Sequence, residues 1–190
     1  MKFPYDIVVF DLECNQPSNK IIEIGAVLVS RDFKYLDEFR AFVNPDEPIS
    51  NDILQLCQLS TDNVTYIGST ERLKVVNDAF YAWATKRTKN VILASWGNFD
   101  VTELHIQDPT CRFRRKALDI KSIAQWELAR WGIKSTNSLS ASCGAFSIDI
   151  VHPQHRALPD AQTTANLFIE MGAKNARLKR ALDFAAGALA

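Results

Sequence analysis

The sequence predicts an α/β protein whose mixed five-stranded sheet joins a three-strand antiparallel meander to parallel strands and is flanked by helices. Three apolar segments separated by short polar links fill the first 43 residues, as in a meander. Segments with helical spacing then alternate with two short strand-like segments. No repeat or linker divides the 190 residues, so we expect one domain, with a motif-bearing core at about 6–172 and a C-terminal helix at about 173–189.

The three strands of the meander are expected at residues 5–12, 20–29 and 35–43. The first contains the uninterrupted apolar run IVVF, which is typical of a central strand covered on both faces. The third alternates apolar and polar residues in part, which indicates one exposed face. Two prolines within residues 44–48 then predict a turn.

The middle of the chain is expected to hold three helices and one strand. A short helix is expected at 51–59, and a longer one at 70–86 has apolar residues at helical spacing: Leu73, Val76, Phe80 and Trp83. The apolar segment at 91–95 predicts a strand. Helical character resumes at residue 98 and ends at Pro109, because proline interrupts a helix. Asp100 therefore falls in a first helical turn.

The last part of the chain is expected to contain a strand at 116–120 and helices at 121–131, 138–146, 159–171 and 173–189. Gly132 suits the end of the first of these helices. Pro159 suits the first position of the third, which places Asp160 in its first turn, where the helix dipole favours a carboxylate.

The composition is that of a soluble globular protein, with 47% hydrophobic and 23% charged residues. No apolar run reaches the length of a membrane span and no secretion signal is evident, so we expect a cytoplasmic protein without membrane association. The four cysteines lack the paired spacing of zinc or redox sites. The 22 basic and 22 acidic residues exclude the strong positive field of a general DNA-binding module, but not a nuclease with an acidic site.

Asp11 and Glu13 lie two residues apart at the end of the first strand, so both side chains project from one face of the sheet. Each alone is compatible with an ordinary surface carboxylate. The preceding buried run, however, places them where a central strand opens into a cleft. Two adjacent carboxylates repel each other, and Mg²⁺ or Mn²⁺ is the kind of cation that oxygen ligands of this charge bind.

Asp100, His155 and Asp160 are the other candidate site residues, and each has an ordinary alternative. Each aspartate could serve only to stabilise a helix N-terminus, where the helix dipole favours a negative charge, and a single histidine is often a loop residue with no catalytic role. Their occurrence together with Asp11 and Glu13 favours a common site.

The order D-x-E, D, H-x-x-x-x-D resembles the DEDDh branch of the DnaQ-like 3′-to-5′ exonucleases. Further segments resemble the family in the same order and extend the likeness over about residues 6–170: IIEIGAV at 21–27, FVNPDEPIS at 42–50, SWGNFD at 95–100, ALDIKSIA at 117–124 and HRALPDA at 155–161. The W-G-x-x-D motif and the D-[IL]-K segment are most similar to those of Eri-1-like members.

The resemblance implies a ribonuclease H-like fold and a metal-dependent exonuclease that hydrolyses phosphodiester bonds at the 3′ ends of single-stranded RNA or DNA, releasing 5′-mononucleotides. It implies two Mg²⁺ or Mn²⁺ ions held by Asp11, Glu13, Asp100 and Asp160, with His155 as general base. The sequence indicates no protein partner and no oligomeric state.

The substrate contacts are expected to differ from those of many relatives. Where those carry a threonine after the D-x-E motif that helps to seat the terminal nucleotide, this chain has Cys14 and Asn15, which we take as candidate substrate-binding residues. Trp96 either stacks on a base or packs in the core. Asn98 either contacts substrate or caps a helix.

Two other functions remain open at this point. The segment VVFDLE resembles the strand motif of haloacid-dehalogenase-type phosphatases, although Glu13 stands where those enzymes need a second aspartate. A catalytically inactive nucleic-acid-binding or adaptor protein on the same fold is the other alternative. Glu23 either supports the ligand residues or is an ordinary strand charge, and the basic run at 112–116 either follows phosphates or is a solvated loop.

Overall fold

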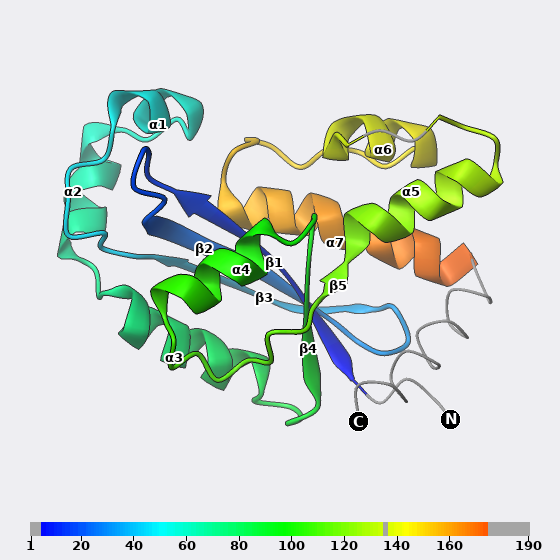
Figure 1. The fold of residues 1–190 in the computed structure, drawn as a ribbon, viewed down its shortest axis with the longest axis horizontal. Helices are drawn as coiled ribbons and strands as arrows, with labels where there is room; N and C mark the ends of the chain where they lie inside the picture. Colours follow the sequence, from blue (N-terminus) through cyan, green and yellow to red (C-terminus); the bar gives the residue numbers. More distant parts are fainter. Residues whose placement is uncertain (1–4, 135–136, 175–190) are drawn as a thin grey trace.

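The computed structural model describes residues 5–134 and 137–174, which form a twisted sheet in the strand order β3-β2-β1-β4-β5 with helices on both faces (Figure 1). Strands β1 (Asp6–Cys14), β2 (Ile21–Val29) and β3 (Tyr35–Phe42) form the antiparallel meander. Strands β4 (Val91–Ser95) and β5 (Leu118–Asp119) continue the sheet in parallel with β1. The predicted fold class is therefore confirmed.

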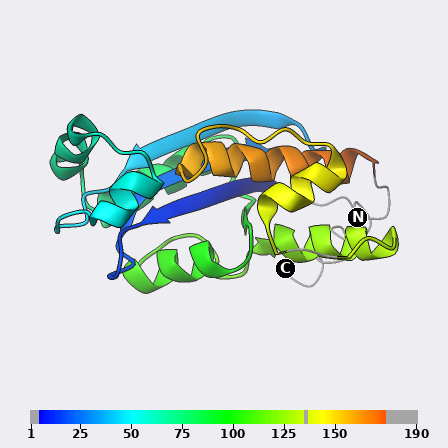
Figure 2. The same ribbon diagram turned by 90° about the horizontal axis from the view of Figure 1, so that it is seen from above.

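Seven helices accompany the sheet in the described ranges: α1 (Asn51–Leu56), α2 (Thr61–Ser69), α3 (Leu73–Ala84), α4 (Phe99–Gln107), α5 (Ile120–Arg130), α6 (Leu139–Phe146) and α7 (Ala157–Lys174). Helices α5, α6 and α7 form a hydrophobic core with one face of the sheet, and α3 and α4 form another with the opposite face. Helices α1 and α2 lie at the end of the molecule toward which β1 points (Figures 1 and 2).

Strand β1 divides its side chains between the two cores. Val8 and Phe10 point toward α3 and α4, whereas Ile7 and Val9 point toward α5 and α7. Because side chains alternate along a strand, the next odd-numbered positions carry their carboxylates on the α7 side of the sheet. The apolar run thus both buries the strand and sets the face on which the acidic residues emerge.

Helix α2 was not predicted, because it has no apolar stripe and buries only Ile67. A capping box starts it instead, in which Ser60 accepts from the Asn63 amide and Asn63 accepts in return. At the other end of the chain, α7 begins at Ala157, two residues earlier than predicted. Pro159 is accommodated in its first turn, where backbone N–H groups have no acceptor within the helix.

The bounds of β5 also differ from the prediction. Strand β5 has two residues rather than five, since Asp119 already caps α5 through its bond from the Ser122 amide (3.1 Å). The helix predicted at 173–189 lies outside the described residues beyond position 174. Gly132 follows α5 with a φ of 70°, in agreement with its predicted role as a stop. Within the described ranges, no helix is both long and apolar enough to cross a membrane.

Gly25 on β2 allows the start of α7 to lie directly against the sheet. A Cβ atom at this position would be 2.1 Å from the carbonyl carbon of Ala157 and 2.1 Å from the nitrogen of Leu158. Gly25 is also the cross-strand partner of Asp11. The close approach therefore brings the first turn of α7 next to the acidic end of β1.

We expect Gly25→Ala to destabilise the protein by about 3 kcal/mol, because backbone atoms on both elements must separate to admit the methyl group. Urea unfolding curves of wild type and variant measure the difference. Gly68→Ala in α2 is the matched control, since nothing lies within 4 Å of the added Cβ and alanine is the better helix former. Equal stability of the Gly25 variant and wild type would contradict the close contact.

Candidate active site

A cleft of about 570 Å³ at the end of β1 brings together all five residues of the predicted site: Asp11, Glu13, Asp100, His155 and Asp160. They come from β1, from the first turns of α4 and α7, and from the loop that precedes α7. Residues separated by up to 149 positions in sequence therefore line one cleft at the end of β1.

Three of the carboxylates form a compact cluster. Asp11, Glu13 and Asp160 each offer an oxygen atom, and these atoms all lie within 4.8 Å of one another. The two-residue spacing on β1 places Asp11 and Glu13 on the same face, and the start of α7 adds Asp160. A set of carboxylate oxygens at this spacing suits a hard divalent cation.

The fourth carboxylate, Asp100, is 6% exposed at the start of α4. Its Oδ1 atom accepts a hydrogen bond from the Leu12 amide of β1 (3.3 Å). This contact ties the helix start to the backbone between Asp11 and Glu13, so Asp100 faces the cluster from the opposite side of the strand end from α7.

Burial and mutual repulsion change the protonation of these groups. Burial raises the pKa of Asp11 well above its usual range, and the charges of Asp100 and Glu13 raise it further. Burial, with the charge of Asp160, raises the pKa of Glu13 to about 8. Burial also raises the pKa of Asp100 to about 7, against the hydrogen bond from Leu12. The cluster therefore holds protons near neutral pH unless a cation takes their place.

His155 lies at the mouth of this cleft. Its side chain is exposed, its φ of 58° is in the left-handed region, and its backbone N–H donates to Asp160 Oδ2 (2.8 Å). The bond lowers the pKa of Asp160, although burial raises it more. The same carboxylate thus belongs to the acidic cluster and fixes the backbone of the candidate base.

Two of the four candidate substrate residues are on or beside the cleft. Trp96 is half-buried, lines the cleft and donates its indole N–H to the Asn137 carbonyl (3.1 Å). Asn98 is exposed and occupies the N-cap position of α4, but its side chain makes no capping hydrogen bond. The indole is therefore both anchored and accessible, while the amide of Asn98 is left for other contacts.

Phe99 lines the cleft with 51% of its surface exposed, and it is not among the residues predicted from the sequence. It is the first residue of α4, immediately before Asp100. The sequence does contain a signal for Phe99, because this aromatic residue immediately precedes a candidate metal ligand at a predicted helix start.

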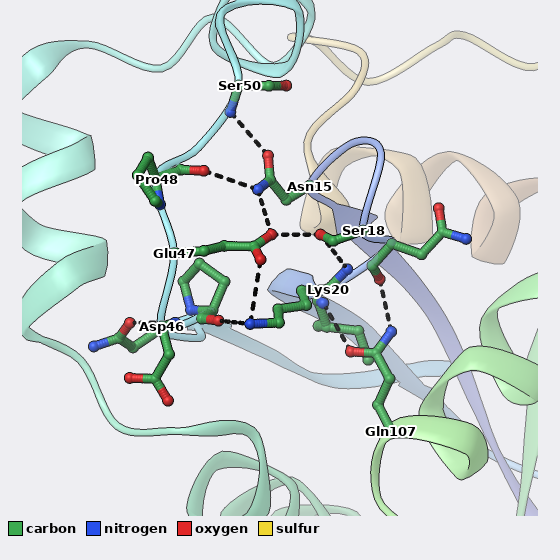
Figure 3. Close-up of polar contacts among 12 residues, drawn as sticks. Asn15, Ser18, Lys20, Asp46, Glu47, Pro48, Ser50 and Gln107 are labelled. Atoms are coloured by element: carbon green, nitrogen blue, oxygen red, sulfur yellow. Dashed lines mark hydrogen bonds and ion pairs between the residues drawn. The ribbon is translucent and has the colours of Figure 1, made fainter.

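The other two candidates, Cys14 and Asn15, do not line the cleft. Cys14 is buried in the core with α3 and α4, and burial raises the pKa of its thiol to about 12. Asn15 is 2% exposed, and its amide binds Glu47 Oε1 (2.7 Å), the Pro48 carbonyl (3.0 Å) and the Ser50 N–H (2.9 Å) (Figure 3). Its side chain joins the end of β1 to the turn before α1.

Glu47 is the centre of this connection. Besides the bond from Asn15, it accepts a hydrogen bond from the Ser18 hydroxyl and pairs with Lys20 Nζ (3.2 Å) (Figure 3). On the other side, Gln107 at the end of α4 binds the Asn19 carbonyl (2.6 Å) and the Ile21 N–H (3.0 Å). The loop that follows the D-x-E motif is thus fixed by protein contacts at both ends.

We expect the stability of the metal-free protein to fall as the pH rises. Since the pKa of Glu13 is raised from 4.5 to about 8 and that of Asp100 from 3.8 to about 7, the folded state holds more protons than the unfolded chain between these values. The stabilisation is complete below the ordinary carboxylate pKa and is lost as the pH passes about 7 to 8. Melting temperatures measured in EDTA from pH 5 to pH 8.5 test this.

Saturating Mg²⁺ or Mn²⁺ should remove most of the fall in melting temperature with rising pH, because a bound cation compensates the charge of the ionised carboxylates. In the absence of metal, Glu13→Gln should make this fall smaller. A melting temperature that is independent of the metal at every pH would contradict a cation site in the cleft.

Comparison with known proteins assigns the family. The chain matches the family model RNase_T, described as exonuclease, over residues 8–168. It is 32% identical over 174 residues to the DNA polymerase III PolC-type of Halalkalibacterium halodurans, and 31% identical over 173 residues to that of Caldanaerobacter subterraneus. Each match covers 87% of this chain but only 11% of the relative.

Solved structures share the fold at lower identity. The chain is similar to cell-death related nuclease 4 (CRN-4; TM-score 0.75, 14% identity, 90% of this chain and 65% of that chain). It is also similar to a 3′-exonuclease that recognises the 3′ end of a histone mRNA stem-loop (0.72, 19%, 90% and 64%). Pop2p of S. pombe, solved with Mg²⁺ and Mn²⁺, is a third example (0.62, 16%, 91% and 87%). With the family model matching most of its length and the acidic motifs meeting in one cleft, the chain belongs to the RNase_T exonuclease family.

Proposed function

We propose that this chain is a metal-dependent 3′-to-5′ exonuclease that removes 5′-mononucleotides from single-stranded RNA or DNA. The observation that carries the proposal is the convergence of Asp11, Glu13 and Asp160 within 4.8 Å, beside Asp100 and His155, in a member of an exonuclease family. The similar solved structures include 3′-exonucleases, which supports the polarity.

Asp11, Glu13 and Asp160 would hold Mg²⁺ or Mn²⁺, in a two-ion site that Asp100 completes directly or through water. The raised pKa values of these carboxylates fit such ligands, because neighbouring acids that repel each other ionise together at lower pH when a cation lies between them. When bound, the ions would activate water and stabilise the charge that develops on the scissile phosphate and the leaving oxygen.

His155 would act as the general base. Its imidazole is at the mouth of the cleft and histidine exchanges protons near neutral pH, so a ring nitrogen can accept the proton of the attacking water. Its backbone bond to Asp160 keeps this ring next to the carboxylate cluster. One loop would thus carry the group that accepts the proton and also bind, through its backbone, a carboxylate that holds the cation.

Phe99 and Trp96 would contact the terminal nucleotide. Both aromatic side chains line the same cleft as the carboxylates, and every base has a π face on which an aromatic ring can stack. Stacking of this kind is tolerant of base identity, as expected of an exonuclease that must remove successive nucleotides. Asn98, exposed at the same helix start, is available to contact the sugar or phosphate.

The alternatives are less compatible with the site. A binding or adaptor protein has no use for four clustered carboxylates whose repulsion lowers the stability of the fold. A haloacid-dehalogenase-type phosphatase requires an aspartate acid at the position of Glu13, which here belongs to the cluster.

Linear and circular single strands of the same sequence test the exonuclease assignment. With Mg²⁺ or Mn²⁺, the linear strand should be degraded and the circle should remain intact, because an exonuclease requires a chain end. Cleavage of both at similar rates would identify an endonuclease. Release of phosphate from a small phosphomonoester, without degradation of either strand, would favour the phosphatase.

A further inference from the structure

Glu23 is a buried carboxylate immediately beside the acidic cluster. It lies on β2 as the cross-strand partner of Glu13 and is 1% exposed. Directly opposed side chains on antiparallel strands are about 5 Å apart at their Cβ atoms, so two glutamates at these positions repel each other. A buried charge in this setting requires strong partners.

Two arginines supply them. Arg156 donates from Nε to Glu23 Oε2 (3.0 Å) and from Nη2 to Oε1 (3.4 Å), while Arg40 donates from Nε to Oε1 (2.7 Å). Both guanidinium groups also lie over the ring of Phe42, at 5.5 and 5.0 Å from its centroid. The side chain of Arg156 is 11% exposed and that of Arg40 is 42% exposed. The pair made by Arg156 is therefore the more deeply buried one, with two-point geometry.

Arg156 directly follows His155 in the chain, and this connects the ion pair to the candidate base. Its carbonyl accepts from the Asp160 N–H (3.0 Å) and so begins the hydrogen bonding of α7. The preceding His155 has a left-handed backbone and donates its N–H to Asp160 Oδ2. Among the described residues, none forms a hydrogen bond with the imidazole of His155 itself, so the position of the ring depends on the backbone that carries it.

We propose that Arg156 is a positioning residue, which uses its buried pair with Glu23 to hold the loop of His155 against β2 beside the acidic cluster. The inference rests on the proposed function, because it assigns to Arg156 the placement of the catalytic base. It also gives Glu23 a role: the carboxylate anchors the base loop from the strand next to the metal ligands.

Arg156→Gln should lower kcat about 30-fold to 100-fold with KM changed less than about threefold, since a misplacement of about 1 Å can cost a hundredfold. Arg156→Lys should recover part of the loss, because it keeps the charge but not the two-point fork. Arg130→Gln is the matched control. Like Arg156, Arg130 donates to both carboxylate oxygens of a buried glutamate, here Glu127 (3.1 Å each), and lies over an aromatic ring, that of Trp126 (4.9 Å). Arg130 is on α5 and does not line the cleft. Its kcat should remain within about twofold of wild type.

The decisive experiment repeats Arg156→Gln in the background of His155→Asn. If Arg156 acts through His155, the second substitution should lower kcat less than about threefold further, because residues that act as a unit are not additive. Equal losses in both backgrounds would overturn the proposal and leave Arg156 a structural residue only. If Arg156→Gln melts below the assay temperature, Glu23→Gln replaces it, and its effect on kcat is again compared between wild type and the His155→Asn background. If His155→Asn and wild type turn over equally, the proposed base is wrong instead, and the two failures are distinguishable.

Discussion

Asp11→Asn is expected to lower kcat at least about a thousandfold, which corresponds to about 4 kcal/mol of transition-state stabilisation. Burial raises the pKa of Asp11, and the neighbouring charges of Asp100, Glu13 and Asp160 raise it further. An amide in its place retains the shape of the side chain but removes the charge that would attract divalent cations. Single-turnover digestion of a labelled oligonucleotide measures the loss.

The same substitution should make the metal-free protein more stable above about pH 7, because it removes a buried charge from a group of like charges. Loss of activity together with a gain of stability separates a functional carboxylate from a structural one. Asp62→Asn on the exposed start of α2 is the control and should change neither quantity. Retained activity in Asp11→Asn would remove this residue from the ligand set.

His155→Asn is expected to lower kcat about 100-fold to 10,000-fold, the usual range for loss of a general base. Asparagine suits this position, since it tolerates the left-handed backbone at φ 58° and keeps the N–H that binds Asp160. Calorimetric titration with Mn²⁺ should therefore show nearly unchanged affinity. A general base is thus distinguished from a residue that holds metal.

His152→Asn is the matched control for that experiment. His152 is an exposed histidine three residues earlier on the same loop, and it does not line the cleft. Its substitution should leave kcat unchanged. If His155→Asn also leaves kcat unchanged, the general-base assignment is wrong.

Periodicity in the sequence predicted the parts of the fold that are formed by apolar patterns. The run before Asp11 identified a central strand, and the two-residue step to Glu13 placed both carboxylates on one face, as the structure shows. Helix α2 was missed because it starts with a polar capping box and buries one side chain, so its sequence carries no stripe. The length of β5 was overestimated because the cap of α5 ends the strand.

The site was predictable where a residue acts through its own chemistry, and not where it acts through a distant partner. The contact of Arg156 with Glu23 spans 133 positions, and that of Asn15 with Glu47 spans 32. No local pattern in the sequence pairs these residues. Asn15 therefore looked like a substrate residue beside the D-x-E motif, whereas the structure uses its amide to join two loops.

Digestion of single-stranded RNA and DNA labelled at the 5′ end, with Mg²⁺, with Mn²⁺ or with EDTA, tests the central claim most directly. A 3′-to-5′ exonuclease with a carboxylate metal site should shorten the labelled strand in single-nucleotide steps, release unlabelled 5′-mononucleotides and stop in EDTA. Comparison of the two ladders also reports the sugar preference. Immediate release of the labelled 5′ nucleotide, or equal degradation in EDTA, would contradict the account.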